Sequence, residues 1–160
     1  MQRVSLITVG KLKEPFYLSA VQEYVKRLQR HCKLSCIELP EQRLGDEPSE
    51  AEIKRALTVE AAAIREKLPK GGAVIAMCIE GKELKSEAFS SLLSSYALSG
   101  KSDVSFLIGG SFGLDEALKK EADFRLSLSP MTFPHHLARV MLLEQIYRAY
   151  EIAAGSKYHK

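Results

Sequence analysis

The chain has 160 residues, of which 46% are hydrophobic and 27% are charged, and its formal net charge at pH 7 is +3. This length fits one domain, and the composition is that of a soluble globular protein rather than a disordered or fibrous chain. No apolar run approaches the roughly 20 residues that a membrane-spanning helix needs, and the N-terminal segment lacks the small-residue cleavage site of a secretory signal. We therefore expect a single domain over residues 1–160 that stays in the cytoplasm, away from membranes.

The charge is unevenly distributed: the two ends of the chain are basic and the middle is acidic. Residues 1–33 carry seven Lys or Arg against two acids, residues 34–124 carry eleven against sixteen, and residues 125–160 carry five against two. If the fold brings both ends to one face, their cations would form a surface that attracts phosphates. The cations concerned are Lys11, Lys13, Lys26, Arg27, Arg30, Lys33, Arg125, Arg139, Lys157 and Lys160. The alternative is a set of ordinary solvated helix faces, and charge alone does not decide between the two.

The three cysteines, Cys32, Cys36 and Cys78, are odd in number and lack the paired spacing of a zinc site. A disulfide framework and a structural metal are therefore not expected. We expect all three to be buried small residues.

The first strand is predicted at residues 4–9, which form a short apolar run. A helix follows from Pro15 to about Leu28, because apolar residues recur there at helical spacing and a proline suits the first helical turn. A second strand is expected at residues 34–39, and residues 40–48 have the composition of a polar, acidic loop.

A capping box marks the start of the next helix. Ser49 and Glu52 have the spacing at which each side chain satisfies a free backbone donor of the other, so a helix is predicted over residues 49–68. The segment Pro69–Gly72 then stops this helix. Residues 73–79 are the most hydrophobic strand candidate, and we expect them to lie centrally in the sheet.

The second half of the chain continues the alternation of strands and helices. Residues 80–82 are expected to form a turn, and a helix is predicted at residues 86–98. The remaining elements are strands at 104–108 and 124–128 and helices at 114–120 and 134–154, with Gly155 placed to end the last helix. This pattern predicts an α/β fold: a Rossmann-like, mostly parallel sheet with helices on both faces.

Three loops follow predicted strand ends, where open α/β sheets bind their ligands: residues 77–81, 109–113 and 128–133. Gly109 and Gly110 let the backbone approach a ligand closely, because no Cβ intervenes. The segment does not match G-x-G-x-x-G, and the chain has no P-loop, so a dinucleotide or a nucleoside triphosphate is poorly supported. The alternative is a plain tight turn.

Pro130 and Pro134 stiffen the segment 128–136, whose other members are mostly apolar or small. Such a loop can offer backbone groups to the edge of a purine such as adenine while excluding water. The alternative is a helix entry bracketed by prolines, in which Thr132 or a neighbour caps the helix. The two interpretations are compatible.

His135 and His136 stand at a predicted helix start without a carboxylate at ligand spacing, so we expect no metal there. A histidine near a helix N-terminus is better suited to donate to a phosphate or to the backbone, and the helix dipole favours its neutral form.

The chain ends in Tyr158, His159 and Lys160. This tail either frays or, when docked, stacks on a base, exchanges a proton and holds a phosphate.

Several segments together resemble one family. They are the glycine segment Ile108–Leu114, the loop Leu128–His135, the helix residues Arg139–Val140 with Glu144–Ala149, the terminal Tyr158–Lys160 and the opening Val9–Lys13. On these residues the chain resembles, over essentially its full length, the RlmH family of bacterial 23S rRNA pseudouridine N3-methyltransferases in the SPOUT methyltransferase superfamily.

The resemblance implies a sheet whose C-terminal part is threaded into a trefoil knot, and a homodimer that binds S-adenosylmethionine among the knotted loops. The cofactor residues that it implies are Met77, Gly109, Leu128, Ser129, Pro130, Met131, Thr132 and Phe133. The implied substrate is the pseudouridine at position 1915 of 23S rRNA in the assembled ribosome, and no metal is implied.

The tail of the partner subunit is implied to act at this site. Tyr158 and His159 are the candidate catalytic residues, with His159 as the base that takes the N3 proton, although binding both reactants in line could supply most of the acceleration. Arg139, His135 and Lys160 are the candidates for holding the rRNA.

The residues alone leave two other classes of protein open: a non-catalytic RNA-binding or ribosome-binding protein that uses the basic face, and a Rossmann-like nucleotide or redox protein.

Overall fold

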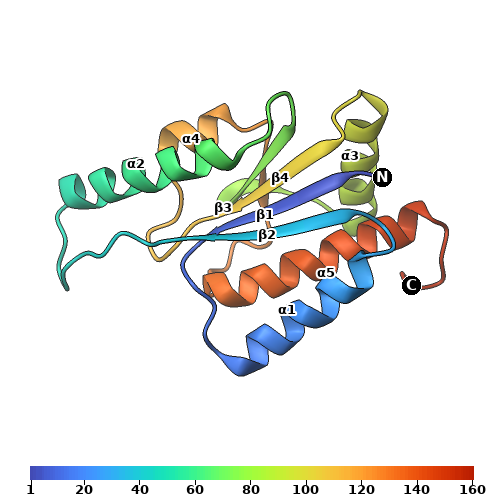
Figure 1. Ribbon diagram of the computed structural model, residues 1–160, viewed down its shortest axis with the longest axis horizontal. Coiled ribbons are helices and arrows are strands. Elements are labelled where there is room, and N and C mark those ends of the chain that lie inside the picture. The colour runs from blue at the N-terminus through green and yellow to red at the C-terminus, as the bar shows by residue number, and fades with distance from the viewer.

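The strands form one sheet in the order β2-β1-β4-β3-β5, and the computed structural model describes the whole chain, residues 1–160 (Figure 1). In chain order the elements are β1 (Arg3–Val9), α1 (Pro15–Leu28), β2 (Lys33–Leu39), α2 (Glu50–Lys67), β3 (Ala73–Glu83), α3 (Ser86–Leu98), β4 (Asp103–Ile108), α4 (Glu116–Glu121), β5 (Phe124–Ser127) and α5 (His135–Ala153). Every pairing between neighbouring strands is parallel. The predicted α/β fold is confirmed.

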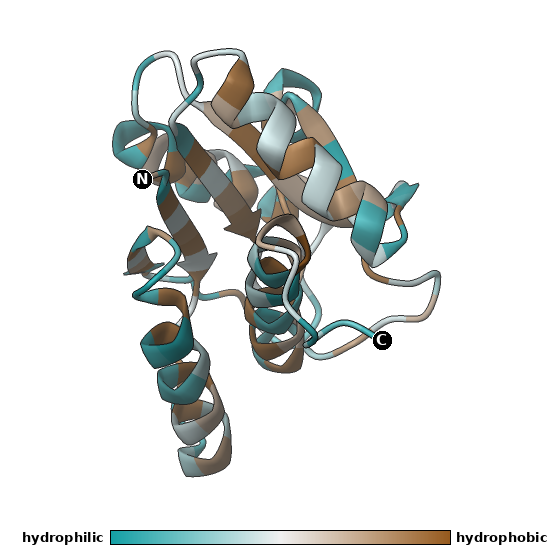
Figure 2. Ribbon diagram, turned by 90° about the vertical axis from the view of Figure 1, so that its right-hand side faces the viewer, coloured by the Kyte–Doolittle hydropathy of each residue, from teal (hydrophilic) through white to brown (hydrophobic).

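Helices cover both faces of this sheet. Leu6 and Phe106 belong to a core that packs against α1, α3 and α5, whereas their neighbours Ile7 and Leu107 belong to a second core against α2 and α4. The two sets alternate because successive side chains of a strand point to opposite faces. Figure 1 shows α1 and α5 side by side over one face, and Figure 2 shows the hydrophobic colour running along the strands between the helices.

Local signals set the ends of several helices. Pro15 is the first residue of α1, and Ser49 caps α2 through the predicted capping box with Glu52. The last helix, α5, ends at Ala153, and Gly155 follows in the left-handed region with φ of +70°. These three predictions are confirmed.

The strand β3 differs from the prediction in length and in place. The turn predicted at residues 80–82 is wrong, because β3 runs on to Glu83 with a register shift against β5 between Met77 and Lys82. The residues between these two pairs bulge out of the β-ladder. Because a bulge with polar residues and a glycine has a composition similar to that of a turn, the sequence predicts a turn here. The central strand is β4, with β3 between it and β5.

The burial of the cysteines also differs from the prediction. Cys32 is buried and Cys78 is half-buried, but Cys36 is exposed, because β2 is an edge strand. All three are free thiols. None of the helices combines the length and apolar character needed to cross a membrane.

Gly81 lies where the bulge of β3 packs on β5, and a Cβ there would lie 2.8 Å from the backbone carbonyl carbon and oxygen of Arg125. We expect Gly81→Ala to lower the free energy of unfolding by about 1–3 kcal/mol, since backbone atoms must move to admit the methyl group. Gly45→Ala is the matched control, because a Cβ there meets nothing within 4 Å. It should be neutral or slightly stabilising. Urea unfolding compares the two variants, and equal stabilities would contradict the close packing at Gly81.

Candidate active site

Two adjoining pockets lie at the edge of the sheet where the strands end. The glycine-loop pocket, about 870 Å³ in volume, is lined by residues at the ends of β3, β4 and β5, including Gly109–Gly113 and Met131–Pro134. The lysine pocket, about 990 Å³ in volume, lies between Lys11 and Lys13, the loop after β2 and the first half of α2. The two pockets share Leu57, Ser111, Phe112 and His135.

The glycine-loop pocket brings together nearly all the residues predicted to bind a cofactor. Its lining includes Met77, Gly109, Leu128, Ser129, Met131, Thr132 and Phe133. Pro130 is exposed and does not line it. Because 12 of the 23 lining residues are hydrophobic, the pocket suits a ligand with an apolar body that is oriented by a few polar groups.

The glycine loop is a tight turn closed on itself. The amide of Gly113 donates to the carbonyl oxygen of Gly110 at 3.1 Å, and Gly113 has a φ of +79°. A Cβ at Gly109 would overlap the carbonyl carbon and oxygen of Gly113. The tight turn and the pocket wall are therefore the same structure, and the absence of a side chain at Gly109 is required by the turn itself.

Serines, rather than a helix cap, hold the loop after β5. The Ser127 hydroxyl donates to the carbonyl oxygen of Ser129, and the amide of Met131 donates to the Ser129 hydroxyl, both at 3.0 Å. The suggestion that Thr132 or a neighbour caps α5 is wrong, because Pro134 occupies the N-cap position and has no side-chain donor or acceptor. The segment therefore serves as a helix entry while it also lines the pocket.

A buried cation lies between two carboxylates on the wall of the glycine-loop pocket. Lys119 Nζ is 2.6 Å from an oxygen of Glu80 and 2.7 Å from one of Glu116. Burial acts to lower the pKa of Lys119, but hydrogen bonds to Glu116 and Glu80 outweigh it, so this pKa is raised and the ammonium is retained. Sequence analysis missed this group, because Glu80 reaches it only through the β3 bulge.

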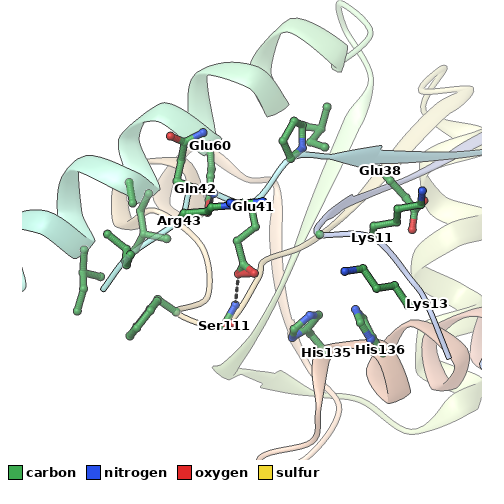
Figure 3. Close-up of a pocket in the computed structure, with 18 of the residues that line it drawn as sticks. Lys11, Lys13, Glu38, Glu41, Gln42, Arg43, Glu60, Ser111, His135 and His136 are labelled. Atoms are coloured by element: carbon green, nitrogen blue, oxygen red, sulfur yellow. Dashed lines mark hydrogen bonds between the residues drawn. The ribbon is translucent and has the colours of Figure 1, made fainter. Parts of the chain in front are cut away.

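Glu41 connects the loop after β2 to the glycine loop. Its carboxylate accepts a hydrogen bond from the backbone amide of Ser111 at 2.7 Å (Figure 3). A Cβ at Gly110 would overlap this carboxylate, so a side chain there would displace Glu41 from the Ser111 amide. Sequence analysis missed Glu41 too, since a glutamate in a polar loop carries no distinguishing pattern.

His135 lines both pockets, and its ring lies nearly perpendicular to that of His136 at a centroid distance of 4.3 Å. Burial, and to a lesser degree His136 and Arg139, lower the pKa of His135, while Glu41 and Glu14 oppose this shift. The ring is therefore neutral at neutral pH. His136 Nδ1 lies 3.1 Å from a Glu14 oxygen. No three potential metal ligands come together in the chain.

Arg139 is buried rather than presented to solvent. Its guanidinium donates to Glu38 at 2.7 Å and to the carbonyl oxygen of Gly10 at 3.3 Å, and its side chain is 6% exposed. These partners leave little of Arg139 available to a phosphate. A contact between Arg139 and rRNA stays a prediction.

The C-terminal tail is docked rather than frayed. The Tyr158 hydroxyl donates to Glu144 at 2.8 Å, and His159 Nε2 lies 2.8 Å from an oxygen of Glu87, in the first turn of α3. None of the three terminal residues lines either pocket of its own chain. The structure therefore separates Tyr158, His159 and Lys160 from the other predicted site residues.

The lowered pKa of His135 predicts a pH dependence of stability. The unfolded chain takes up this proton near the ordinary value of 6.5, before the folded protein does. As pH falls below that value, protonation favours the unfolded chain, so the wild type should lose stability relative to His135→Gln. Urea unfolding of both proteins at pH 8 and pH 5.5 measures the difference. A difference that is the same at both pH values would show that the His135 ring titrates normally.

Comparisons with known proteins agree on one family. A family model described as "Predicted SPOUT methyltransferase" matches residues 2–159. The chain is 48% identical over 158 residues to the ribosomal RNA large subunit methyltransferase H of Streptococcus suis, with 99% of each chain covered. It is 46% identical over 157 residues to the ribosomal RNA large subunit methyltransferase H 1 of Clostridium perfringens, with 98% and 99% covered.

Solved structures share the fold at low sequence identity. A probable methyltransferase from Bordetella pertussis superposes with a TM-score of 0.56 at 15% identity, over 93% of this chain and 96% of that one. A Legionella pneumophila protein solved with bound cofactor SAM superposes with a TM-score of 0.51 at 14% identity, over 95% and 66%. On the family match and the full-length relatives, the chain belongs to the SPOUT methyltransferase family.

Proposed function

We propose that the protein is an S-adenosylmethionine-dependent methyltransferase of large-subunit ribosomal RNA that methylates N3 of the pseudouridine at position 1915 of 23S rRNA. The observation that carries the proposal is the glycine-loop pocket, where the residues implied by the family resemblance meet at the ends of three parallel strands. The names of the full-length relatives supply the substrate class. A purely RNA-binding protein would not need such a pocket.

The lining of the glycine-loop pocket fits this cofactor. Gly109, Leu128, Ser129 and Met131–Phe133 would hold the adenosine through backbone groups, and Met77 would pack against it. The carboxylates of Glu80 and Glu116 face the same pocket and could accept hydrogen bonds from hydroxyl or ammonium groups. When bound, S-adenosylmethionine supplies an activated methyl group on its sulfonium. We retain the trefoil knot of these loops as part of the proposal.

Methyl transfer to N3 breaks the N3–H bond and forms an N3–CH₃ bond, so a group must take the proton. We propose His159 of the partner subunit as that base. In its own chain His159 Nδ1 lies 3.1 Å from Arg148, and its Nε2 contacts Glu87. The ring must leave one of these partners before it can accept a proton.

A homodimer is part of this proposal, because the tail lines neither the glycine-loop pocket nor the lysine pocket of its own chain and would act in a site of another copy. Tyr158 and Lys160 would then help to position the nucleotide in the partner's site. The assembled ribosome is the proposed form of the substrate, since one small domain offers a limited surface for RNA recognition. The cytoplasm is the corresponding location.

The glycine turn makes the cofactor site testable. We expect Gly109→Ala to weaken S-adenosylmethionine binding at least about tenfold, because the added methyl group forces the turn open. Gly45→Ala, in open space, should bind normally. Titration calorimetry measures both affinities, with circular dichroism to check folding. Equal affinities would remove the glycine turn from the cofactor site.

The role of the tail is tested by His159→Ala, with Lys157→Ala as the control. Loss of a general base should lower kcat on ribosomal particles that lack the methyl group by about 100-fold or more, with normal cofactor affinity. Mixing His159→Ala with Gly109→Ala should restore activity if the tail acts across the dimer, because one mixed site then has both an intact pocket and an intact tail. No restoration would show that the tail does not act in the partner's site. Absence of methyl transfer by the wild type would overturn the proposed function.

A further inference from the structure

We propose that the lysine pocket binds the RNA strand at the target nucleotide: its free cations hold backbone phosphates, and Phe112 stacks on a base. This inference, which rests on the proposed function, names the surface that recognises the RNA. Its cations lie in the β1–α1 loop and the loop after β2, outside the predicted cofactor site, and Phe112 lies at the boundary between the two pockets.

Three exposed cations line the lysine pocket, and Lys11 is close enough to Glu38 to interact with it electrostatically. Lys11, Lys13 and Arg43 line the pocket, are exposed, and take part in no salt bridge. Gly10, with a φ of +102°, turns the chain out of β1 just before the lysines. Figure 3 shows Lys13 on the same side of the pocket as His135.

Each carboxylate that lines the lysine pocket already accepts a hydrogen bond from another group of the protein. Glu38 is held by Arg139, and Glu60 accepts a hydrogen bond from the backbone amide of Gln42 at 2.8 Å. Glu41 accepts from the amide of Ser111. These contacts hold the three carboxylates against the protein framework, whereas the Lys11, Lys13 and Arg43 side chains are exposed and can turn toward a phosphate.

Three arginines of the predicted phosphate surface are less available than Lys11 and Lys13. Arg30 pairs with Glu151, and Arg27 pairs with Glu23 at 3.6 Å. Arg139 is buried with Glu38. The remaining cations of that surface, Lys26, Lys33, Arg125, Lys157 and Lys160, are exposed but line neither pocket, so Lys11 and Lys13 are the members of the set that lie at a cavity.

The lysine pocket also adjoins the place where methyl transfer would occur. Phe112 and His135 line both this pocket and the glycine-loop pocket, so a base seated at their boundary is next to a bound cofactor. The Phe112 ring is 49% exposed, so it is accessible to a base at the boundary of the two pockets. Unpaired bases of RNA commonly stack on such rings.

The test compares Lys11→Gln/Lys13→Gln with wild type on large ribosomal particles that lack the methyl group. We expect KM to rise about tenfold or more while kcat and S-adenosylmethionine affinity stay within about twofold, since phosphate contacts position the substrate without taking part in the chemistry. The slope of log affinity against log salt should become shallower by about 1.4, because each single-strand phosphate contact contributes roughly 0.7. Lys11→Arg/Lys13→Arg, which keeps both charges, should restore most of the affinity.

The matched control is Lys67→Gln/Lys70→Gln, which removes two exposed lysines at and beyond the far end of α2. If the two glutamine variants show the same KM and the same salt slope, the lysine pocket does not hold the RNA. Phe112→Leu should weaken particle binding more than Phe112→Tyr, and equal effects would remove the stacking contact. If wild type binds the particles but transfers no methyl group, the proposed function fails while the binding data still decide the role of the pocket.

Discussion

The close approach of Gly109 and Gly113 is the constraint on which the site depends. The turn closes so tightly that the backbone of Gly113 occupies the place where a Cβ of Gly109 would lie. Because β4 is the central strand and all pairings are parallel, the loops after β3 and β5 open at the same edge of the sheet as this turn. A pocket rich in apolar side chains and backbone groups results, which suits a nucleoside-like cofactor.

A second interaction, between Glu41 and the amide of Ser111, joins this turn to the loop that follows the edge strand β2. The loop after β2 thereby becomes a wall shared with the glycine loop, and the lysine pocket forms beside the glycine-loop pocket. Cofactor and RNA would occupy separate spaces that meet at Phe112 and His135. The neutral state of His135 keeps this boundary free of positive charge, since burial lowers its pKa.

The sequence predicted the order and type of the elements because each carries a local signal, such as the capping box at Ser49 or the glycine after α5. It also predicted most of the glycine-loop pocket, since the carboxyl ends of parallel strands converge whatever the details of the helices. The β3 bulge, the Glu80–Lys119 ion pair and the contact of Glu41 with Ser111 were not predictable, because they join residues far apart in the chain. The separation of the tail from both pockets likewise depends on how it docks against Glu87 and Glu144.

The most direct measurement is titration calorimetry of the wild-type protein with S-adenosylmethionine, followed by competition with S-adenosylhomocysteine. The glycine-loop pocket predicts saturable binding of one cofactor per chain, and displacement by the product at the same site. Absence of heat together with absence of competition would contradict the assignment of this pocket, and with it the proposed methyl transfer.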